Sequence, residues 1–343
     1  MLFRHAGKAS RPEQETFLKI LSGTLLLAGI AVAAVRVDVN GGLYPRFLVS
    51  AKKSSFFLMG AEATVRAQVT SRTRDILTAA VQLTAGSAMQ GWTTGFHFGE
   101  AYVLFPTGLR LPTIRIGQAV IPFGLMVDYD IHSQIVQTSF ARSLGLRLDP
   151  GIGVLGSLGP ADYWLWVSNG NGPYVMDNDV DKVITTRIAP TFLLGDAEVT
   201  AGLSGLFGSL PHWSLDSLSA MVSGPRDYAA KYRLGLDNTT DWGPLTLRLE
   251  GIIGKDSTLS HPLVFGYYGE ARYSFAYWIQ ALGKYDGWHT EAGSARNLGA
   301  GVNLRLPDVS MVEFQVLYQI DFLNTGAHDE QDWSIVSQVA VSF

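Results

Sequence analysis

The stretch WSIVSQVAVSF, residues 333–343, alternates apolar and polar side chains over most of its length. Alternation with a period of two residues predicts a β-strand whose successive side chains point to opposite faces. One face would carry Trp333, Ile335, Val339, Val341 and Phe343, and the other Ser334, Val336, Gln338 and Ser342. A water-soluble sheet that is buried on one side has the same signature, so a single strand does not decide the fold.

The same alternation recurs along the rest of the chain. Apolar side chains alternate with polar ones in residues 61–69, 198–207, 229–237, 245–250, 297–306 and 312–322. Aromatic residues of the apolar face lie near the ends of such segments: Phe105, Phe207, Tyr228, Tyr273, Phe275, Tyr277, Phe322, Trp333 and Phe343. Aromatic residues at both rims with aliphatic residues between them are typical of a lipid-facing strand.

The length of these segments favours the same interpretation. Many of them reach about 10 residues, which a tilted strand needs in order to cross the hydrocarbon core of a membrane. Strands exposed to lipid have to close into a barrel, because hydrocarbon offers no hydrogen-bond partners to a free edge. The sequence therefore predicts an all-β fold, a transmembrane antiparallel β-barrel. On this interpretation Phe343 anchors the last strand at the rim, and the terminal strand resembles the C-terminal recognition signal of outer-membrane barrels.

The composition agrees with a barrel and excludes several other classes of protein. Hydrophobic residues make up 47% of the 343 residues and charged residues 16%, against roughly 25% charged residues in ordinary soluble chains. The mean hydropathy is +0.15, yet the only long apolar run lies near the N-terminus. The absence of cysteine excludes disulfides, thiolate metal sites and cysteine nucleophiles. A net charge of −4 lacks the basic character of a nucleic-acid-binding protein.

Residues 1–33 are predicted to be a signal peptide, which leaves 34–343 as a single barrel domain. Four basic side chains precede the apolar run at 20–33: Arg4, Lys8, Arg11 and Lys19. The run ends in Ala31-Val32-Ala33, which matches the small-residue pattern of a cleavage site. The alternative is a membrane anchor helix, but the run is short for spanning a bilayer.

Sixteen strands are predicted, an even number as bacterial single-chain barrels require. They lie near 39–49, 55–70, 75–86, 94–105, 111–120, 151–159, 162–169, 182–193, 197–207, 227–237, 244–254, 263–274, 276–286, 295–306, 309–322 and 333–343. Residues 263–286 contain no clear turn, so fourteen strands are the alternative. Short connections, such as 159–161, 194–196 and 238–243, alternate with long ones, such as 121–150, 208–226 and 287–294. Barrels with turns on one side of the membrane and loops on the other are expected to alternate in this way.

The longest connection, residues 121–150, is predicted to fold into the lumen and narrow it. It contains Ile131, Ile135, Val136, Phe140 and Leu144, which are too apolar for a loop that extends into water. Long connections of this kind are usually functional or disordered. The candidate constriction residues are Asp128, Asp130, His132, Arg142 and Arg147.

In its middle third the chain resembles the phosphate-selective O/P-type porin superfamily, sixteen-stranded bacterial outer-membrane channels. The resemblance rests on EAYVLF at 100–105, RIGQAVIPFG at 115–124, WVSNGNG at 166–172 and DKVITTRIAP at 181–190, in that order and spacing. It implies a trimeric passive channel in the bacterial outer membrane, with an inward third loop. Selectivity for phosphate in this family relies on lumenal arginines together with a lysine cluster.

The charges that the alternation places on the inner wall are nearly balanced. The basic residues are Arg66, Arg115, Arg187, Lys231, Arg233, Arg248, Arg272, Lys284 and Arg305. The acidic ones are Glu62, Glu100, Glu198, Asp237, Glu250, Glu270, Glu313 and Asp321. No lysine cluster is visible, which argues against strong phosphate selectivity. Two interpretations stay open: these charges only solvate the wall and pair across strands, or they form a transverse field that tunes ion passage.

The expected function is a porin for passive diffusion of small hydrophilic solutes or ions, with weak selectivity and no enzymatic activity. We expect a homotrimer that contacts membrane lipid and lipopolysaccharide, and we expect neither a cofactor nor a metal. The DNDVD stretch at 177–181 lacks the glycine and distal glutamate of an EF-hand, so a solvated loop is favoured. One alternative is an outer-membrane lipase that uses His261 with Ser257 or Ser260, and another is a barrel sleeve around a partner protein.

Overall fold

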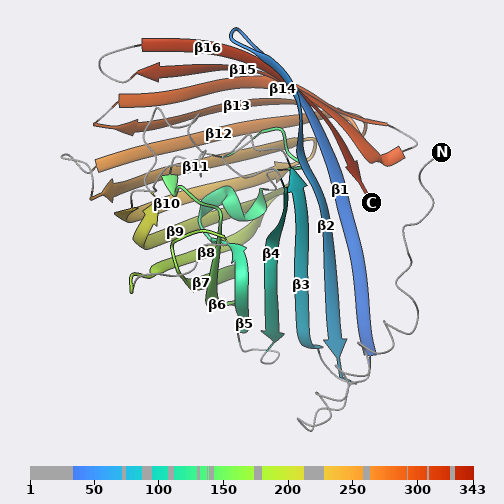
Figure 1. Ribbon diagram of the computed structural model, residues 1–343, viewed down its shortest axis with the longest axis vertical. Coiled ribbons are helices and arrows are strands. Elements are labelled where there is room, and N and C mark those ends of the chain that lie inside the picture. The colour runs from blue at the N-terminus through green and yellow to red at the C-terminus, as the bar shows by residue number, and fades with distance from the viewer. Residues whose placement is uncertain are drawn as a thin grey trace.

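The chain forms one closed barrel of sixteen antiparallel strands (Figure 1). The computed structural model describes residues 34–71, 75–86, 95–106, 112–129, 132–136, 138, 143–173, 180–211, 228–257, 263–291, 293–306, 309–324 and 329–343. The predicted signal peptide, residues 1–33, lies outside the described residues. Each strand pairs with its neighbours in sequence, and the first strand pairs with the last. The predicted all-β antiparallel barrel is therefore confirmed.

The strands follow the predicted segments closely, and the count is sixteen rather than fourteen. They are β1 (Ala34–Ser50), β2 (Ser54–Thr70), β3 (Asp75–Gly86), β4 (Gly95–Pro106), β5 (Thr113–Val120), β6 (Leu148–Leu158), β7 (Ala161–Ser168), β8 (Val183–Leu194), β9 (Ala197–Pro211), β10 (Tyr228–Trp242), β11 (Leu245–Asp256), β12 (Leu263–Ala276), β13 (Ile279–Thr290), β14 (Gly293–Leu306), β15 (Val309–Asn324) and β16 (Asp329–Ser342). A short 3₁₀ helix, η1 (Gly124–Asp128), lies between β5 and β6.

Three predicted connections are corrected. The turn expected at 238–243 is part of β10, which continues to Trp242 and turns at Gly243, where φ is +55°. The long loop expected at 287–294 is also strand, because β13 ends at Thr290 and β14 begins at Gly293. In both cases polar and small side chains, which suggest a loop, lie in continuous backbone pairing with the neighbouring strand. The third long connection ends at 147 rather than 150, because β6 begins at Leu148.

The barrel closes between β1 and β16. The register runs from Gly42 opposite Ser342 to Ser50 opposite Ser334. Beyond it, the Gly41 amide donates to the Phe343 carbonyl at 2.9 Å, and the Phe343 amide donates back at 3.0 Å. Pro45, which interrupts the predicted first strand, lies at a register shift between β1 and β2. Proline has no amide hydrogen to donate, so a bulge is where a strand tolerates it.

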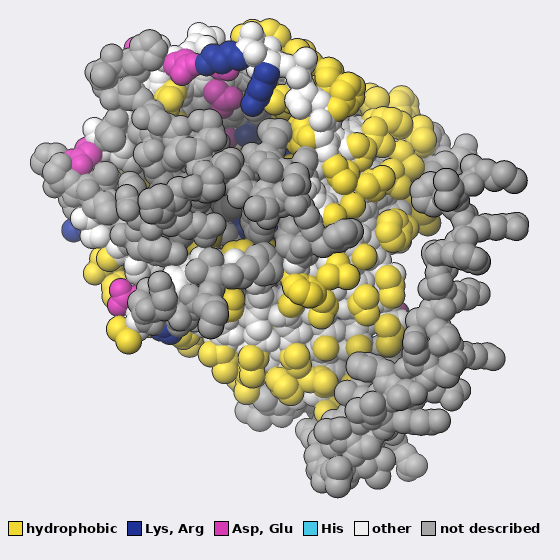
Figure 2. Space-filling view, in the orientation of Figure 1, with side chains coloured by type: hydrophobic (Ala, Val, Ile, Leu, Met, Phe, Trp, Pro, Cys, Tyr) yellow, Lys and Arg dark blue, Asp and Glu magenta, His cyan; other side chains and the backbone are white. Residues whose placement is uncertain are grey.

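The two faces of the barrel differ in chemistry. Large apolar side chains on the outer face are exposed, among them the predicted aromatic residues Phe105, Phe207, Tyr273, Phe275, Tyr277, Phe322, Trp333 and Phe343. Figure 2 shows hydrophobic side chains spread over the outer surface on the side of β1–β4. The inner face instead carries buried charged and amide side chains. In the described part of the chain, no helix is long and apolar enough to cross a membrane.

Candidate functional site

The β5–β6 segment, residues 121–147, packs against inner-face side chains of the barrel. It begins with Ile121 and Phe123, both buried, and then forms η1. Gly124 has φ of +55°, and a Cβ added there would lie 1.7 Å from Oε1 of Glu250. Only glycine fits this position without strain, since a side chain disfavours positive φ and here would also collide with the wall. In Figure 1 the coil of η1 appears within the curve of the strands.

Two backbone amides fix the start of η1 to the wall. The amide of Gly124 donates to Oγ of Ser204 on β9 at 3.0 Å, and that of Leu125 donates to Oε1 of Glu250 on β11, also at 3.0 Å. These are amides at the start of a helical turn, which lack partners within the turn itself. The predicted wall residue Glu250 is therefore buried as an anchor for the segment.

A second anchor is built around Tyr129. Its hydroxyl lies 3.0 Å from the Tyr268 hydroxyl, and both hydroxyls donate to the carboxylate of Glu270. The guanidinium of Arg248 lies 5.0 Å from the centre of the Tyr129 ring. Arg272 donates to the same Glu270 carboxylate, so the charge of Glu270 is balanced where the segment docks.

His132 anchors the segment to the other side of the barrel. Its Nδ1 lies 3.1 Å from Oε2 of Glu62 on β2. Arg46 on β1 donates to the carbonyl oxygens of His132 and Gln134, at 3.2 and 2.9 Å. Gln338 on β16 donates to the carbonyl of Ser133 at 2.9 Å. One segment thus connects β1, β2 and β16 to β9, β11 and β12.

The end of the segment is bound by cations of β10. Nζ of Lys231 donates to the carbonyl of Leu144 at 3.1 Å, and Nε of Arg233 donates to the carbonyl of Ser143 at 2.9 Å. Arg233 also forms an ion pair with Asp256 of β11 and lies 5.5 Å from the ring centre of Trp288. Both predicted wall cations therefore satisfy backbone carbonyls of the segment.

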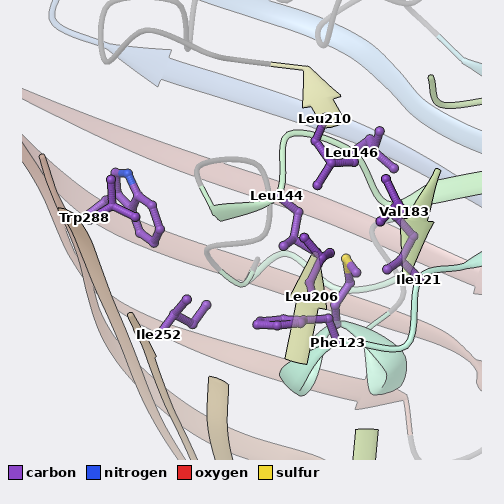
Figure 3. Packing of buried hydrophobic residues seen from close by; sticks show 11 residues of the cluster. Ile121, Phe123, Leu144, Leu146, Val183, Leu206, Leu210, Ile252 and Trp288 are labelled. Carbon is purple, nitrogen blue, oxygen red and sulfur yellow. The ribbon is translucent and has the colours of Figure 1, made fainter. Parts of the chain in front are cut away.

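Apolar contacts supplement these hydrogen bonds. One cluster joins five residues of the segment to inner-face residues of β8, β9, β11, β12 and β13: Ile121, Phe123, Met126, Leu144 and Leu146 with Val183, Leu206, Leu210, Ile252, Val264 and Trp288. Figure 3 shows the Phe123 ring beside Leu206 and Leu144. A second cluster holds Leu125, Tyr129, Ile135 and Val136 against Tyr268, Leu282 and Leu317. Of the five apolar loop residues named from the sequence, Ile135, Val136 and Leu144 are thus buried against the wall, whereas Ile131 and Phe140 lie outside the described residues.

Most of the predicted wall cations pair with carboxylates. Arg187 and Asp237 form a buried bidentate pair at 2.5 and 3.4 Å. Lys284 contacts Asp286 at 3.0 Å, Arg305 contacts Glu313 at 3.1 Å, and Arg248 lies 3.5 Å from Glu270. Asp256 and Asp286 are inner-face carboxylates that the sequence prediction missed.

Arg66 and Arg115 differ from these cations. Neither forms an ion pair with another side chain that the structure describes; Arg66 is exposed and Arg115 is half-buried. The Arg115 guanidinium lies 4.8 Å from the centre of the Tyr102 ring. Nearby on β4, the Glu100 carboxylate accepts the amide hydrogen of Val120 at 3.3 Å.

The exposure of inner-face side chains differs around the barrel. Although Glu198 near one end of β9 is exposed, a central group on β8–β10 is buried: Thr185, Arg187, Ser204, Lys231, Arg233 and Asp237. Although Ala80 and Thr84 of β3 are buried, a group on β2–β5 remains partly exposed: Thr64, Arg66, Gln68, Thr78, Gln82, Glu100, Tyr102 and Arg115. The wall opposite the main docking surface of the segment is therefore the accessible one.

The candidate constriction residues are placed in part. His132 contacts Glu62, and Nη2 of Arg147 donates to the Tyr129 carbonyl at 2.7 Å. Asp128 ends η1, whereas Asp130 and Arg142 lie outside the described residues. Sequence reasoning missed the anchors Arg46, Tyr129 and Gln338. Arg46 and Gln338 carried one usable signal, since the alternation places both polar side chains on the inner face.

The described residues give no support to a metal site or to the lipase alternative. Within the described ranges no group of three or more histidine, aspartate or glutamate residues could hold a metal ion. Most of the acidic stretch, residues 177–179, lies outside these ranges, as do Ser260 and His261 of the lipase alternative. Oγ of Ser257 accepts the amide hydrogen of Ala230 at 3.0 Å.

Among solved structures the chain is similar to several outer-membrane proteins. OmpT, an outer membrane protein of Vibrio cholerae in a trimer form, has a TM-score of 0.66 and 12% identity, with 90% of this chain and 100% of that chain covered. The outer membrane channel DcaP of Acinetobacter baumannii has a TM-score of 0.63 and 11% identity, covering 92% and 99%. A BenF-like porin from Pseudomonas fluorescens Pf-5 has a TM-score of 0.52 and 8% identity, covering 91% and 100%.

No protein-family model and no curated protein matches the chain. The likenesses show the fold, a sixteen-stranded barrel of the outer-membrane type, and this fold points to the bacterial outer membrane as the location. The phosphate-selective O/P family suggested by the sequence stays a resemblance.

Proposed function

We propose that the protein is an outer-membrane porin, a passive diffusion channel for small hydrophilic solutes or ions with weak selectivity. One observation carries the proposal: a closed barrel exposes apolar side chains outside and places ionic and amide side chains inside. Such a surface is stable in lipid, and such a wall is stable in water. The named porin and channel among the similar structures support the same function.

In this proposal the β5–β6 segment narrows the lumen, and the passage follows β2–β5. Hydrogen bonds and apolar clusters connect the segment to strands on both sides of the barrel. The wall that stays accessible contains Arg66, Glu100 and Arg115. We propose that the candidate constriction residues Asp128, Asp130, His132, Arg142 and Arg147 belong to the opposite side of this passage.

Weak selectivity follows from the pairing of the wall charges. A neutralised pair such as Arg187–Asp237 gives a small net field in the lumen, whereas an unpaired cation acts at longer range. Arg66 and Arg115 would therefore contribute most of the wall's selectivity. The other wall residues named from the sequence, including Lys231, Arg233, Arg248, Glu250 and Arg272, would mainly hold the segment in place.

A homotrimer in contact with membrane lipid and lipopolysaccharide remains part of the proposal, as does the absence of enzymatic activity. The trimer form of the similar OmpT structure supports such an assembly. The sleeve alternative is disfavoured because a segment of the chain itself reaches across to many strands of the inner wall. A partner protein would have to displace it.

Planar-bilayer recording of the purified, detergent-solubilised protein tests the proposed function. Stepwise increases in current, each of the same size, are expected as single channels insert. Recovery of folded protein from the membrane shows that insertion has taken place. If the bilayer then shows no current steps, the result contradicts the porin proposal and favours a sleeve or an enzyme.

Selectivity is tested separately by reversal potentials in a salt gradient. Arg66→Gln combined with Arg115→Gln is expected to shift the channel toward cations, because two accessible positive charges leave the passage. Arg187→Gln combined with Asp237→Asn, which removes a neutral pair, serves as the matched control with an unchanged reversal potential. Asp128→Asn with Asp130→Asn tests the segment side, and an unchanged value there would exclude these two carboxylates from the filter.

A further inference from the structure

Two basic side chains of the described strands lie on the apolar outer face of the barrel. Lys255 of β11 pairs directly with Tyr232 and Leu263, whose side chains are exposed on the outer face. Arg296 of β14 is exposed and pairs with Phe322, another outward aromatic residue. Directly opposed residues of antiparallel strands share a face, so both cations point outward. They lie near the same rim of the barrel, the one at which β5 and β6 are joined by the long segment 121–147, although the connection beside Arg296 is only residues 291–292.

Aromatic side chains fill the outer surface between these cations. A Cβ at Gly287, which pairs with Arg296, would lie 2.4 Å from Cζ of Tyr267, so the Tyr267 ring covers this glycine. The Tyr267 hydroxyl donates to the Tyr285 hydroxyl at 3.0 Å. His289 lies beside the same cluster, with 5.9 Å between its ring centre and that of Tyr267. The basic aromatic patch is defined here as Lys255, Phe265, Tyr267, Tyr285, His289 and Arg296.

The dimensions of the patch suit a lipid headgroup. Lys255 and Arg296 are three strand spacings apart, roughly 14 Å, and about four residues apart along the strands, roughly 13 Å. Their backbones are therefore roughly 20 Å apart, and the two long side chains reach toward one headgroup from both sides. Arg296 is the fourth residue of β14, so it lies about 10 Å along the strand from that end, within reach of the interface for a long side chain. Tyrosines at this depth are typical of the interfacial belt, where rings contact acyl chains and hydroxyls contact headgroups.

The charges distinguish a lipid from a second copy of the chain. The described carboxylates of the strands lie on the inner face or at the first residue of a strand, as Asp75 and Asp329 do. The outer face of another barrel therefore offers few partners for Lys255 and Arg296. A phosphate group offers both charge and acceptor oxygens, and arginine can bind it with two parallel hydrogen bonds.

We propose that the basic aromatic patch on β11–β14 binds the phosphorylated headgroup of an outer-leaflet glycolipid. The inference rests on the proposed membrane location, with the longer connections on the outer side. The cations bind phosphate, and the aromatic rings contact the first part of the acyl chains. This assigns a specific site to the lipopolysaccharide contact that was expected only in general terms.

Native mass spectrometry of the full-length folded barrel in non-ionic detergent, titrated with diphosphorylated lipid A, tests the proposal. Lys255→Gln combined with Arg296→Gln is expected to weaken binding at least about tenfold, because two basic contacts to an anionic headgroup are lost. Lys52→Gln is the matched control: Lys52 lies at the same end, but its charge is already paired with Glu330 and Asp332. Lipid A that lacks phosphate should bind the native barrel as weakly as the double variant binds the phosphorylated form.

Heat-dependent gel mobility establishes that both the double variant and the native barrel are folded. If the two then bind lipid A with equal affinity, the proposal is overturned. A double variant that loses trimers but keeps its lipid affinity would also overturn it, and would identify the patch as an interface between copies. The binding assay does not depend on ion flow. A barrel that binds lipid but passes no current would therefore contradict the proposed channel function and still support the lipid site.

Discussion

At the scale of single residues, Gly124 is the position where the β5–β6 segment is most sensitive to change. Its backbone has φ of +55° and lies against Glu250. Gly124→Ala adds backbone strain of about 1–2 kcal/mol, and the new Cβ displaces the Glu250 carboxylate that accepts from the Leu125 amide, so the start of η1 should be held less firmly. We expect larger fluctuations of the open-channel current. Gly195→Ala is the control, because Gly195 has φ of +63° but no neighbour within 4 Å, and its current should match that of the native protein.

The second prediction at this scale concerns the contribution of the buried Arg187–Asp237 pair to the unfolding free energy. Asp237→Asn leaves the Arg187 charge buried without its partner, and this is expected to cost roughly 3–5 kcal/mol of unfolding free energy. Arg305→Gln breaks a pair in which the Arg305 side chain is 59% exposed, so it should cost at most about 1 kcal/mol. Urea unfolding from lipid vesicles, followed by tryptophan fluorescence, measures both. Equal losses in the two variants would contradict the assignment of Arg187–Asp237 as a buried structural pair.

Sequence reasoning at this scale predicted faces but not partners. Alternation placed Arg187, Arg233 and Lys284 on the inner wall, because the side-chain direction in a strand depends only on parity. The sequence analysis missed Asp286, although that residue lies two positions after Lys284 and therefore points to the same face. It missed Asp256 because the strand was expected to end at residue 254. Which carboxylate a cation meets depends on strand register, which one strand's sequence does not contain.

At the scale of elements, the β5–β6 segment should limit the current. Replacing residues 122–146 with a short Gly-Ser linker removes both apolar clusters and their wall contacts. We expect a severalfold larger single-channel conductance, because the passage is no longer restricted to the β2–β5 side. Unchanged heat-dependent gel mobility would establish that the barrel is still closed. An unchanged conductance in such a closed barrel would mean that the segment does not narrow the lumen.

The second prediction at this scale concerns the junction between β1 and β16, where the barrel closes. Deleting Phe343 removes the two hydrogen bonds that join its backbone to Gly41, together with an exposed aromatic side chain. The yield of folded barrel should fall, as measured by the fraction with heat-modifiable mobility. Phe343→Trp keeps the backbone pairing and an aromatic ring, so its yield should equal that of the native chain. Equal yields for deletion and replacement would contradict a role for this junction in closure.

The elements themselves were largely predictable from sequence, and their exceptions have local causes. Strong alternation in 297–306 and 312–322 led to predicted strands at 295–306 and 309–322, which match β14 and β15 almost to their ends. The end of β10 was misjudged because residues 238–241 are polar and resemble a turn, yet they pair along β9 and β11. Where the β5–β6 segment docks could not be predicted, because its contacts come from strands far apart in the chain.

At the scale of the whole molecule, the proposed channel requires that the inner face of the barrel meets water and the outer face meets lipid. Thr64 and Val65 are neighbours on β2 with opposite directions. Thr64 pairs with Asn40 and Gln82, while Val65 is 41% exposed and pairs with the exposed Val39 and Val81. The chain contains no cysteine, so a thiol introduced at either position is unique.

The most direct test is therefore the current through Thr64→Cys and Val65→Cys channels in a planar bilayer, before and after a charged, water-soluble thiol reagent is added. We predict that the reagent reduces the current of Thr64→Cys channels stepwise and leaves Val65→Cys channels unchanged. The opposite result would be a reduced current in Val65→Cys channels and an unchanged current in Thr64→Cys channels. It would place the aqueous path on the other face and contradict the proposed orientation of the barrel wall.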